Sequence, residues 1–139
     1  ALRDAYWALN WSIKTIADNT TVKEVMGKKW QLNPVNGYWY WLKADKDKFS
    51  TLCQGLGAYI FDMWCMAVFE LTQERFGRDP MFLGQFHDEL ILKVKNHDKS
   101  RAAWDKIVMD AIGVVNDKLN LNRELGCDVQ FGNNYSEIH

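Results

Sequence analysis

The hydrophobic positions of the chain recur with a helical period in three stretches. Apolar side chains at every third or fourth position predict an opening helix that ends near Asp18. The same rhythm continues from Asp47 to Phe76 for about six turns, which predicts one long and largely buried helix. A third amphipathic helix is expected from Asp98, a residue type that favours the N-cap, to Leu119.

Alternating apolar and polar positions predict five short strands, at residues 30–32, 38–42, 81–86, 90–95 and 127–131. The first two flank Asn33–Gly37, where a Pro and an Asn-Gly pair favour a hairpin loop. The next two flank His87, Asp88 and Glu89, which we therefore expect at the tip of a second hairpin. Long helices and hairpins in this order predict an α+β fold.

Two glycines interrupt the predicted long helix. Gly55 and Gly57 each cost about 1 kcal/mol relative to Ala in a helix interior. Two such costs within one turn indicate that another element or a ligand approaches the helix backbone closely.

The composition is that of a globular protein. The 139 residues are 47% hydrophobic and 25% charged, and 7 are Trp, so aromatic packing is expected to dominate the core. No apolar run approaches the ~20 residues of a membrane span, which predicts a chain with no membrane partner. Three cysteines without the spacing of a zinc site favour reduced, buried thiols in a cytoplasmic protein.

The charge balance bears on nucleic-acid binding. A formal net charge of -1 argues against strong independent binding, which normally needs a basic face. Lysines are denser at residues 23–29 and 43–48, where a solvated surface is the simpler interpretation of the first cluster. Trp39 and Trp41 are able to stack on bases, but alternation in a strand places one face of the hairpin in the core by default.

The tip of the second hairpin carries the candidate chemistry. The carboxylate of Asp88, held between two strands, suits a hard divalent cation such as Mg²⁺, which takes oxygen ligands and keeps several waters. The alternative is that Asp88 is only a turn residue, because Asp tolerates turn geometry and bonds its own backbone.

Three segments in fixed order resemble the C-terminal palm of a family A DNA polymerase, most of all its bacteriophage replicative branch. They are Gln54-Gly55-x-x-Ala58, Gln85-Phe86-His87-Asp88-Glu89-Leu90 and Gly132-x-Asn134-Tyr135-x-x-x-His139. The second resembles the third polymerase motif of the family, and the last resembles its Gly-x-Asn-Trp-x-x-x-His ending. The resemblance covers essentially the whole chain: residues 1–45 resemble the helix and hairpin between fingers and palm, and residues 46–139 the palm with its catalytic hairpin against long helices.

The resemblance implies a part in template-dependent nucleotidyl transfer. In the family, two Asp residues from different palm segments hold the two metal ions that bridge the primer hydroxyl and the triphosphate. Asp88 would be one of these two Mg²⁺ ligands, and Glu89 would be an auxiliary catalytic carboxylate beside it.

The same resemblance implies contacts with primer-template DNA. His87 would lie beside the primer terminus, and Gln54 would donate to the minor-groove acceptors that all base pairs share. Lys46 stands where the family usually has an Arg that touches the primer strand, and Ser50 stands where it commonly has an Asn. The simpler interpretations are that Gln54 is a polar residue at an exposed helix edge and that His87 is neutral and bonds a nearby backbone carbonyl.

Two parts of the family's catalytic core have no counterpart in this sequence. One is an Asp at a strand end followed by a helical Glu, and the other is the fingers helix that grips the incoming dNTP. One carboxylate-bearing turn cannot hold two cations ~3.5–4 Å apart. We therefore expect a companion chain, the N-terminal portion of the polymerase, as in a split phage enzyme that acts in the host cytoplasm.

Two other functional classes match part of the pattern. One is a non-catalytic palm-like module that is structural or docks on DNA. The other is a small metal-dependent hydrolase that acts alone, for which Asp62 is the only alternative acidic partner. The position of Asp62 between Phe61 and Met63 favours the edge of a helix instead.

Overall fold

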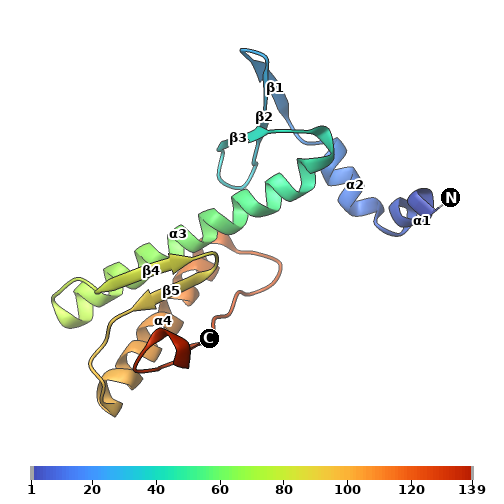
Figure 1. Cartoon of the computed structure of the whole chain (residues 1–139). Coiled ribbons are helices and arrows are strands. Elements are labelled where there is room, and N and C mark those ends of the chain that lie inside the picture. Colours follow the sequence, from blue (N-terminus) through green and yellow to red (C-terminus); the bar gives the residue numbers. More distant parts are fainter. Residues whose placement is uncertain (1, 139) are drawn as a thin grey trace. The chain divides into compact units, whose positions relative to one another are not determined.

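A computed structural model describes residues 2–138 and divides the chain into two compact units, Ala1–Tyr59 and Ile60–His139. Helices and two small antiparallel sheets make up an α+β fold, as the sequence predicts (Figure 1). The long helix α3, Lys48–Phe76, contributes its first part to one unit and its second part to the other.

The opening helix is two helices rather than the single one that the periodicity predicts. α1 covers Leu2–Leu9 and α2 covers Trp11–Asp18, so the predicted end near Asp18 is confirmed. Asn10 separates them with φ -107° and ψ 37°, and its side-chain amide donates to the Tyr6 carbonyl at 2.9 Å. The same carbonyl also accepts from the Asn10 backbone amide at 3.0 Å, so the break is a local change of backbone angles at a residue type with a lower helix propensity than Ala or Leu.

The first unit contains a three-stranded sheet in the order β1-β2-β3, made of Val22–Val25, Lys28–Leu32 and Trp39–Leu42. The predicted hairpin between β2 and β3 is confirmed, with Leu32 opposite Trp39. β1 was not predicted. It turns into β2 through Met26 and Gly27, which both have positive φ, 52° and 69°. A two-residue turn with two positive φ angles is a common hairpin connection, but Met-Gly is not among its usual sequence signals.

The inner face of this sheet is tied to the start of α3 by buried amides. The side-chain nitrogen of Gln31 donates to the Lys48 carbonyl at 2.9 Å, and that of Asn33 donates to the Leu52 carbonyl at 3.1 Å. Both amide side chains are almost fully buried, as is Leu42 on the neighbouring strand. The sheet is therefore positioned on the helix by directional bonds as well as by apolar contact.

The core of the second unit lies between the later turns of α3 and helix α4, Asp98–Leu119. Its buried members are Phe61, Trp64, Ala67, Val68, Trp104, Ile107, Val108, Ala111, Ile112 and Val115. The predicted inner face of α4 is confirmed. The prediction that α3 is largely buried is wrong, because between Lys48 and Tyr59 only Gly55 is buried. Periodicity shows that a helix has an apolar face but not how far a partner covers it.

The second hairpin is confirmed in position, but its second strand ends at Leu92, before the predicted end at residue 95. β4 covers Phe82–Phe86 and β5 covers Glu89–Leu92, and Phe86 pairs with Glu89 across a two-residue turn. Leu90 and Leu92 pack against the core, so the predicted half-buried strand is also confirmed. A bulge at Leu83, between the paired residues Phe82 and Gly84, shifts the register at the start of β4.

Two predictions near the C-terminus are corrected. The N-cap of α4 is His97 rather than Asp98: its ring Nδ1 accepts from the Ser100 amide at 3.1 Å. His97 is exposed, as expected. Residues 127–131 are not a strand, because within residues 2–138 no other strand pairs with them. Their apolar positions alternate because one side packs against the core of the unit.

The structure also tests what the composition predicted for the cysteines. The three cysteines are free, as predicted. Cys53 is exposed and the other two are half-buried, so the prediction that all three thiols are buried is wrong.

Among the described residues, the helical stretch Asp45–Phe76 is long and apolar enough to span a membrane by length and composition alone. Core helices of soluble proteins pass the same test, so the absence of a membrane partner stays a prediction.

Candidate functional site

The tip of the β4–β5 hairpin presents His87 and Asp88 to solvent. His87 has a φ of 52°, in the left-handed region that a non-glycine residue enters only at a cost of about 1–2 kcal/mol. Within residues 2–138, neither the His87 ring nor the Asp88 carboxylate has a hydrogen-bond or ion-pair partner, and both side chains are exposed. Glu89, the first residue of β5, is also exposed. The three side chains predicted for the site therefore lie together at the hairpin tip, two on the turn and one at the start of β5.

This hairpin is backed by aromatic contacts at both ends of β4. The ring of Phe82 stacks on Phe69 of α3, with centroids 6.4 Å apart and an interplanar angle of 2°. Phe86, next to the turn, contacts Tyr135 with centroids 6.0 Å apart. The contact between Phe86 and Tyr135 brings the second and third motifs of the sequence together and supports the end of β4 beside the turn that carries Asp88.

The C-terminal motif folds into a compact turn that ends in the short 3₁₀ helix η2, Tyr135–Glu137. The Glu137 carboxylate accepts from the Asn133 backbone amide and the Asn134 side chain, both at 2.8 Å. A Cβ on Gly132 would lie 2.8 Å from Glu137 Cβ and 2.9 Å from Ile138 Cγ2. The glycine of the motif is therefore required by this turn. His139 lies outside the described residues.

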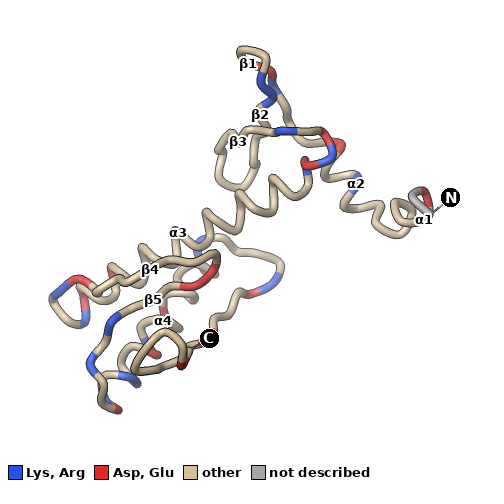
Figure 2. Tube along the Cα trace, in the orientation of Figure 1, with Lys and Arg blue, Asp and Glu red and all other residues tan. Residues whose placement is uncertain are grey.

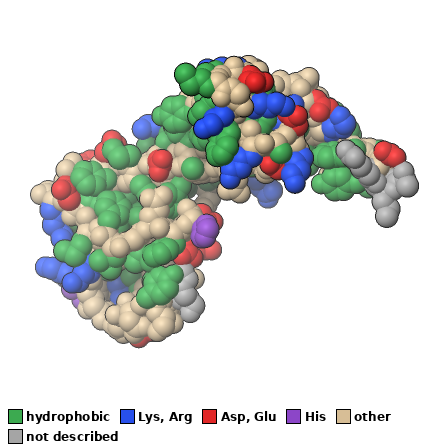
Figure 3. All heavy atoms as spheres, turned by 45° about the horizontal axis from the view of Figure 1, so that its top comes forward, with side chains coloured by type: hydrophobic (Ala, Val, Ile, Leu, Met, Phe, Trp, Pro, Cys, Tyr) green, Lys and Arg blue, Asp and Glu red, His purple; other side chains and the backbone are tan. Residues whose placement is uncertain are grey.

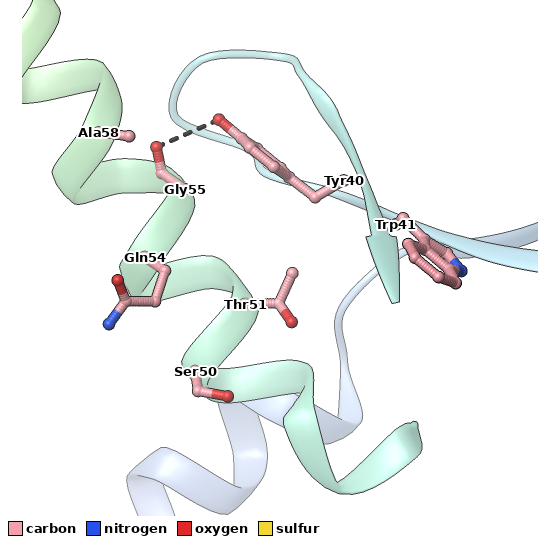
Figure 4. Close-up of a pocket in the computed structure, with 7 residues that line it drawn as sticks. All are labelled: Tyr40, Trp41, Ser50, Thr51, Gln54, Gly55 and Ala58. Carbon is pink, nitrogen blue, oxygen red and sulfur yellow. Dashed lines mark hydrogen bonds between the residues drawn. The ribbon is translucent and has the colours of Figure 1, made fainter. Parts of the chain in front are cut away.

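The second group of predicted residues lies in the first unit, on and just before the start of α3. Ser50 and Gln54 line a shallow, open depression of about 360 Å³ together with Tyr40, Trp41, Thr51, Gly55 and Ala58 (Figure 4). The Gln54 amide extends away from Tyr40 and is exposed, without a hydrogen bond inside the described chain. The Ser50 hydroxyl donates to the Asp47 carbonyl at 3.0 Å.

Gly55 confirms that an element approaches the helix backbone closely, and that element is β3. A Cβ on Gly55 would lie 2.7 Å from the ring of Tyr40, whereas a Cβ on Gly57 would meet nothing within 4 Å. Only the first of the two glycines is therefore explained by a contact in this structure.

Lys46 lies one turn before Ser50, in the short 3₁₀ helix η1, Asp45–Asp47. Its ammonium group is exposed and has no ion-pair partner among the described residues. Its neighbour Asp45 is bound by Lys29 at 2.9 Å, and this hydrogen bond and charge lower the pKa of the Asp45 carboxyl. Within residues 2–138, Lys46 therefore keeps a cation without an ion pair beside the start of α3.

The structure thus sorts the predicted residues into two groups. His87, Asp88 and Glu89 lie at the hairpin tip of the second unit, and Lys46, Ser50 and Gln54 lie in the first unit. In the part of the chain that the structure describes, no three His, Cys, Asp or Glu side chains converge as a metal site. Asp62, the alternative acidic partner, is exposed on α3, as its neighbours in the sequence predicted.

The sequence interpretation missed one feature of the first unit. It left open which face of the β2–β3 hairpin carries Trp39 and Trp41, and it did not predict β1. The available signal was the alternation within each strand, which places Lys28 with Trp30, and Trp39 with Trp41 and Lys43, on one side of a strand.

Comparison of this chain with protein-family models, with curated proteins and with solved structures gives no match.

Proposed function

We propose that this chain is the C-terminal palm portion of a family A DNA polymerase and takes part in nucleotidyl transfer once a companion chain supplies the remainder. Asp88 binds one of the Mg²⁺ ions and Glu89 assists it. His87, Gln54, Lys46 and Ser50 contact primer-template DNA, and the dNTP is held mainly by the companion.

The observation that carries this proposal is the state of Asp88. Asp residues occur in hairpin turns because they bond their own backbone. In this turn the Asp88 carboxylate makes no such bond within residues 2–138 and faces solvent. A carboxylate on a hairpin turn that makes no bond within residues 2–138 is available to a hard cation. The interpretation of Asp88 as a simple turn residue therefore lacks the backbone hydrogen bond that usually explains an Asp in a turn.

The chemistry of the donor set agrees with an incomplete metal site. Asp88 and Glu89 offer carboxylate oxygens, the ligand type that Mg²⁺ prefers. Two-metal phosphoryl transfer needs two cations about 3.5–4 Å apart, which requires at least one more acidic segment. No third ligand converges here among the described residues. The missing acidic residue is the part that we assign to the companion.

The surface beside the hairpin supports a companion chain. Met81, Phe82, Leu83 and Phe86 all expose 40% or more of their surface along β4. Figure 3 shows hydrophobic side chains gathered on this unit. β4 has only β5 as a partner, so one edge of this apolar strand is unpaired in the described chain. Exposed apolar strands with an open edge are covered in stable proteins by another element or another chain.

The first unit supplies groups suited to a DNA duplex. The Gln54 side chain can donate to purine N3 and pyrimidine O2 in the minor groove, acceptors that do not depend on sequence. The free ammonium of Lys46 can bind a phosphate. Ser50 is the weaker candidate, because its hydroxyl hydrogen already serves the Asp47 carbonyl.

The alternative is a non-catalytic palm-like module that is structural or docks on DNA. The lack of three converging metal ligands within residues 2–138 is expected for this module as well as for an incomplete metal site. The two functions differ in one requirement, since only the polymerase needs the Asp88 carboxylate.

Primer extension distinguishes them. The chain is mixed with the polypeptide encoded immediately upstream, and incorporation of labelled dNTP is measured with Mg²⁺. We expect incorporation by the mixture, and its loss on the order of a thousandfold in Asp88→Ala. Asp62→Ala, an exposed acid of the same unit, is the control and should keep activity.

Full activity of Asp88→Ala would leave Asp88 as a turn residue. A mixture that neither associates nor incorporates nucleotide would contradict the polymerase assignment. Metal-dependent hydrolysis by the chain alone would favour the small hydrolase instead.

A further inference from the structure

We propose that the outer face of the β1–β2–β3 sheet binds single-stranded nucleic acid. This Lys–Trp face consists of Lys23, Lys28, Trp30, Trp39, Trp41 and Lys43. It lies within the first unit, apart from the hairpin that carries Asp88, and it does not depend on the polymerase assignment.

The strand register defines this face. Lys23 is opposite Trp30, which is opposite Trp41 on the third strand. Lys28 and Trp39 occupy the same side, because side chains alternate along a strand. The intervening residues Gln31 and Tyr40 point inward, where they bond α3. In Figure 4 the ring of Tyr40 lies toward the helix and that of Trp41 lies on the other side of the strand.

The lysines of this face lie over its indole rings. The ammonium of Lys23 is 3.8 Å from the centroid of the Trp39 ring. Those of Lys28 and Lys43 are 5.5 Å and 5.4 Å from the Trp41 ring. Trp41 nevertheless remains 51% exposed. Cations and aromatic rings are thus interleaved at the surface, as binding of a phosphate backbone with unstacked bases requires.

The nearby acidic groups do not face this surface. Glu24 is paired with Lys29 on the opposite side of the sheet. Asp45 is bound by Lys29 at 2.9 Å. No Asp or Glu occupies a position of β1, β2 or β3 on the Lys–Trp face. The whole chain is therefore nearly neutral in formal charge although it carries a local basic face, and Figure 2 shows lysines in blue along β1 and β2.

The aromatic part of the face selects the partner. In a duplex the bases are stacked on one another, so a duplex offers this surface only its phosphates. A single strand offers phosphates for the lysines and free base faces for Trp39 and Trp41. DNA and RNA share this chemistry. We therefore expect binding to single strands that is salt-dependent and tolerant of sequence.

The test is fluorescence anisotropy of labelled oligothymidylate titrated with the full chain at several salt concentrations. Oligouridylate and a duplex of equal length are titrated in parallel, which separates RNA, DNA and paired strands. We expect the single strands to bind more tightly than the duplex. Trp41→Ala should weaken binding by about 5- to 150-fold, the equivalent of the 1–3 kcal/mol that one stacked base contributes.

Matched variants separate this face from general electrostatics. Lys28→Gln should lower the slope of log affinity against log salt by about 0.7, the value for one phosphate contact on a single strand. Lys29→Gln changes the next residue of the same strand, which points to the other side and binds Asp45, so the slope should stay unchanged. Trp11→Ala removes a 68% exposed indole outside the sheet and should keep wild-type affinity.

Trp41→Phe is the control for misfolding of Trp41→Ala. It keeps an aromatic ring and should recover most of the affinity lost in Trp41→Ala. Circular dichroism confirms that each variant is folded. The proposal is overturned if single strands do not bind, if the duplex binds as tightly, or if Lys28→Gln and Lys29→Gln lose equal affinity. A failure of primer extension by the reconstituted polymerase leaves these expectations unchanged.

Discussion

The hydroxyl of Tyr40 donates a hydrogen bond of 3.1 Å to the carbonyl of Gly55 and holds the sheet of the first unit against helix α3. The same phenol oxygen accepts from the Asn36 side chain at 2.9 Å, so the ring is fixed at its far end. The ring occupies the space that a side chain at position 55 would need. Because Gly55 lies beside Gln54, this contact also sets the position of a proposed duplex contact.

Gly55→Ala is expected to destabilise the protein although Ala favours a helix. The new methyl group would lie 2.7 Å from the Tyr40 ring, and moving that ring breaks its hydrogen bonds. Overpacking of this kind costs about 1–3 kcal/mol, and together with the loss of the Tyr40 hydrogen bonds it should exceed the roughly 1 kcal/mol of helix propensity gained. Urea denaturation followed by circular dichroism measures the difference.

Gly57→Ala is the matched control for that substitution. It lies in the same helix two residues later and has open space around it. We expect a gain in the free energy of unfolding of up to about 1 kcal/mol. A loss of stability in Gly55→Ala together with a gain in Gly57→Ala would confirm the packing at Gly55, whereas a gain in both variants would show that the Tyr40 ring moves at little cost.

Much of this fold follows from periodicity and turn residues. The β2–β3 loop at Asn33–Gly37, the long helix and the Asp88 hairpin were all predicted, because each has a strong local pattern. β1 was missed because its turn, Met26-Gly27, lacks the usual residues. The strand at residues 127–131 was wrongly predicted because alternation reports one-sided burial, whether or not a neighbouring strand is present.

The candidate site is only partly predictable for a different reason. The grouping of His87, Asp88 and Glu89 is local, so the sequence contains it. The outward direction of Trp39 and Trp41 depends on the amides of Gln31 and Asn33, which bind α3 and thereby select the buried face. Such long-range hydrogen bonds leave no periodic signal.

Gly132→Ala is expected to open the C-terminal turn. A methyl group there would meet Glu137 Cβ and Ile138 Cγ2, which cannot swing away as a long side chain can. Hydrogen exchange should accelerate at the amides of Asn133 and Ser136, which lose their side-chain acceptors. Gly126→Ala, with open space at its site, should leave exchange unchanged. Slow exchange in both variants would contradict this structure of the turn.

The three thiols are expected to react at different rates. Burial, and then the nearby charge of Asp62, raise the pKa of the Cys65 thiol to about 11. Burial, followed by Asp128 and Asp105, raises the pKa of Cys127 as well. Because the thiolate is the nucleophile, these two should alkylate slowly at pH 8.

Cys53 is exposed and should be the first thiol modified. Mass spectrometry after a short iodoacetamide pulse identifies the modified residue. Cys53→Ser should remove the fast phase, and a fast phase that persists in this variant would contradict the burial of Cys65 and Cys127.

Asp110 links α4 to α3 and should make stability depend on pH. Hydrogen bonds from Arg75 and then Lys106 lower the pKa of its carboxyl, so the folded state favours the charged form. The stabilisation is complete above the unfolded-state pKa of about 4 and is lost as the pH falls through the lower folded-state value. Asp110→Asn should therefore have a lower free energy of unfolding than wild type at pH 7, and this difference should shrink as the pH falls. A difference that grows in acid would show that the ion pair does not cause the loss of stability.

The most direct measurement of the central claim is the effect of Mn²⁺, as a paramagnetic substitute for Mg²⁺, on the amide resonances of the full chain. A small fraction of Mn²⁺ should broaden the amides of residues 87–89 before others, because its oxygen ligands are those of Mg²⁺. Asp88→Asn should abolish this broadening and Asp62→Asn should retain it. Broadening that does not centre on the hairpin tip, or that survives in Asp88→Asn, would contradict the assignment of Asp88 as a metal ligand.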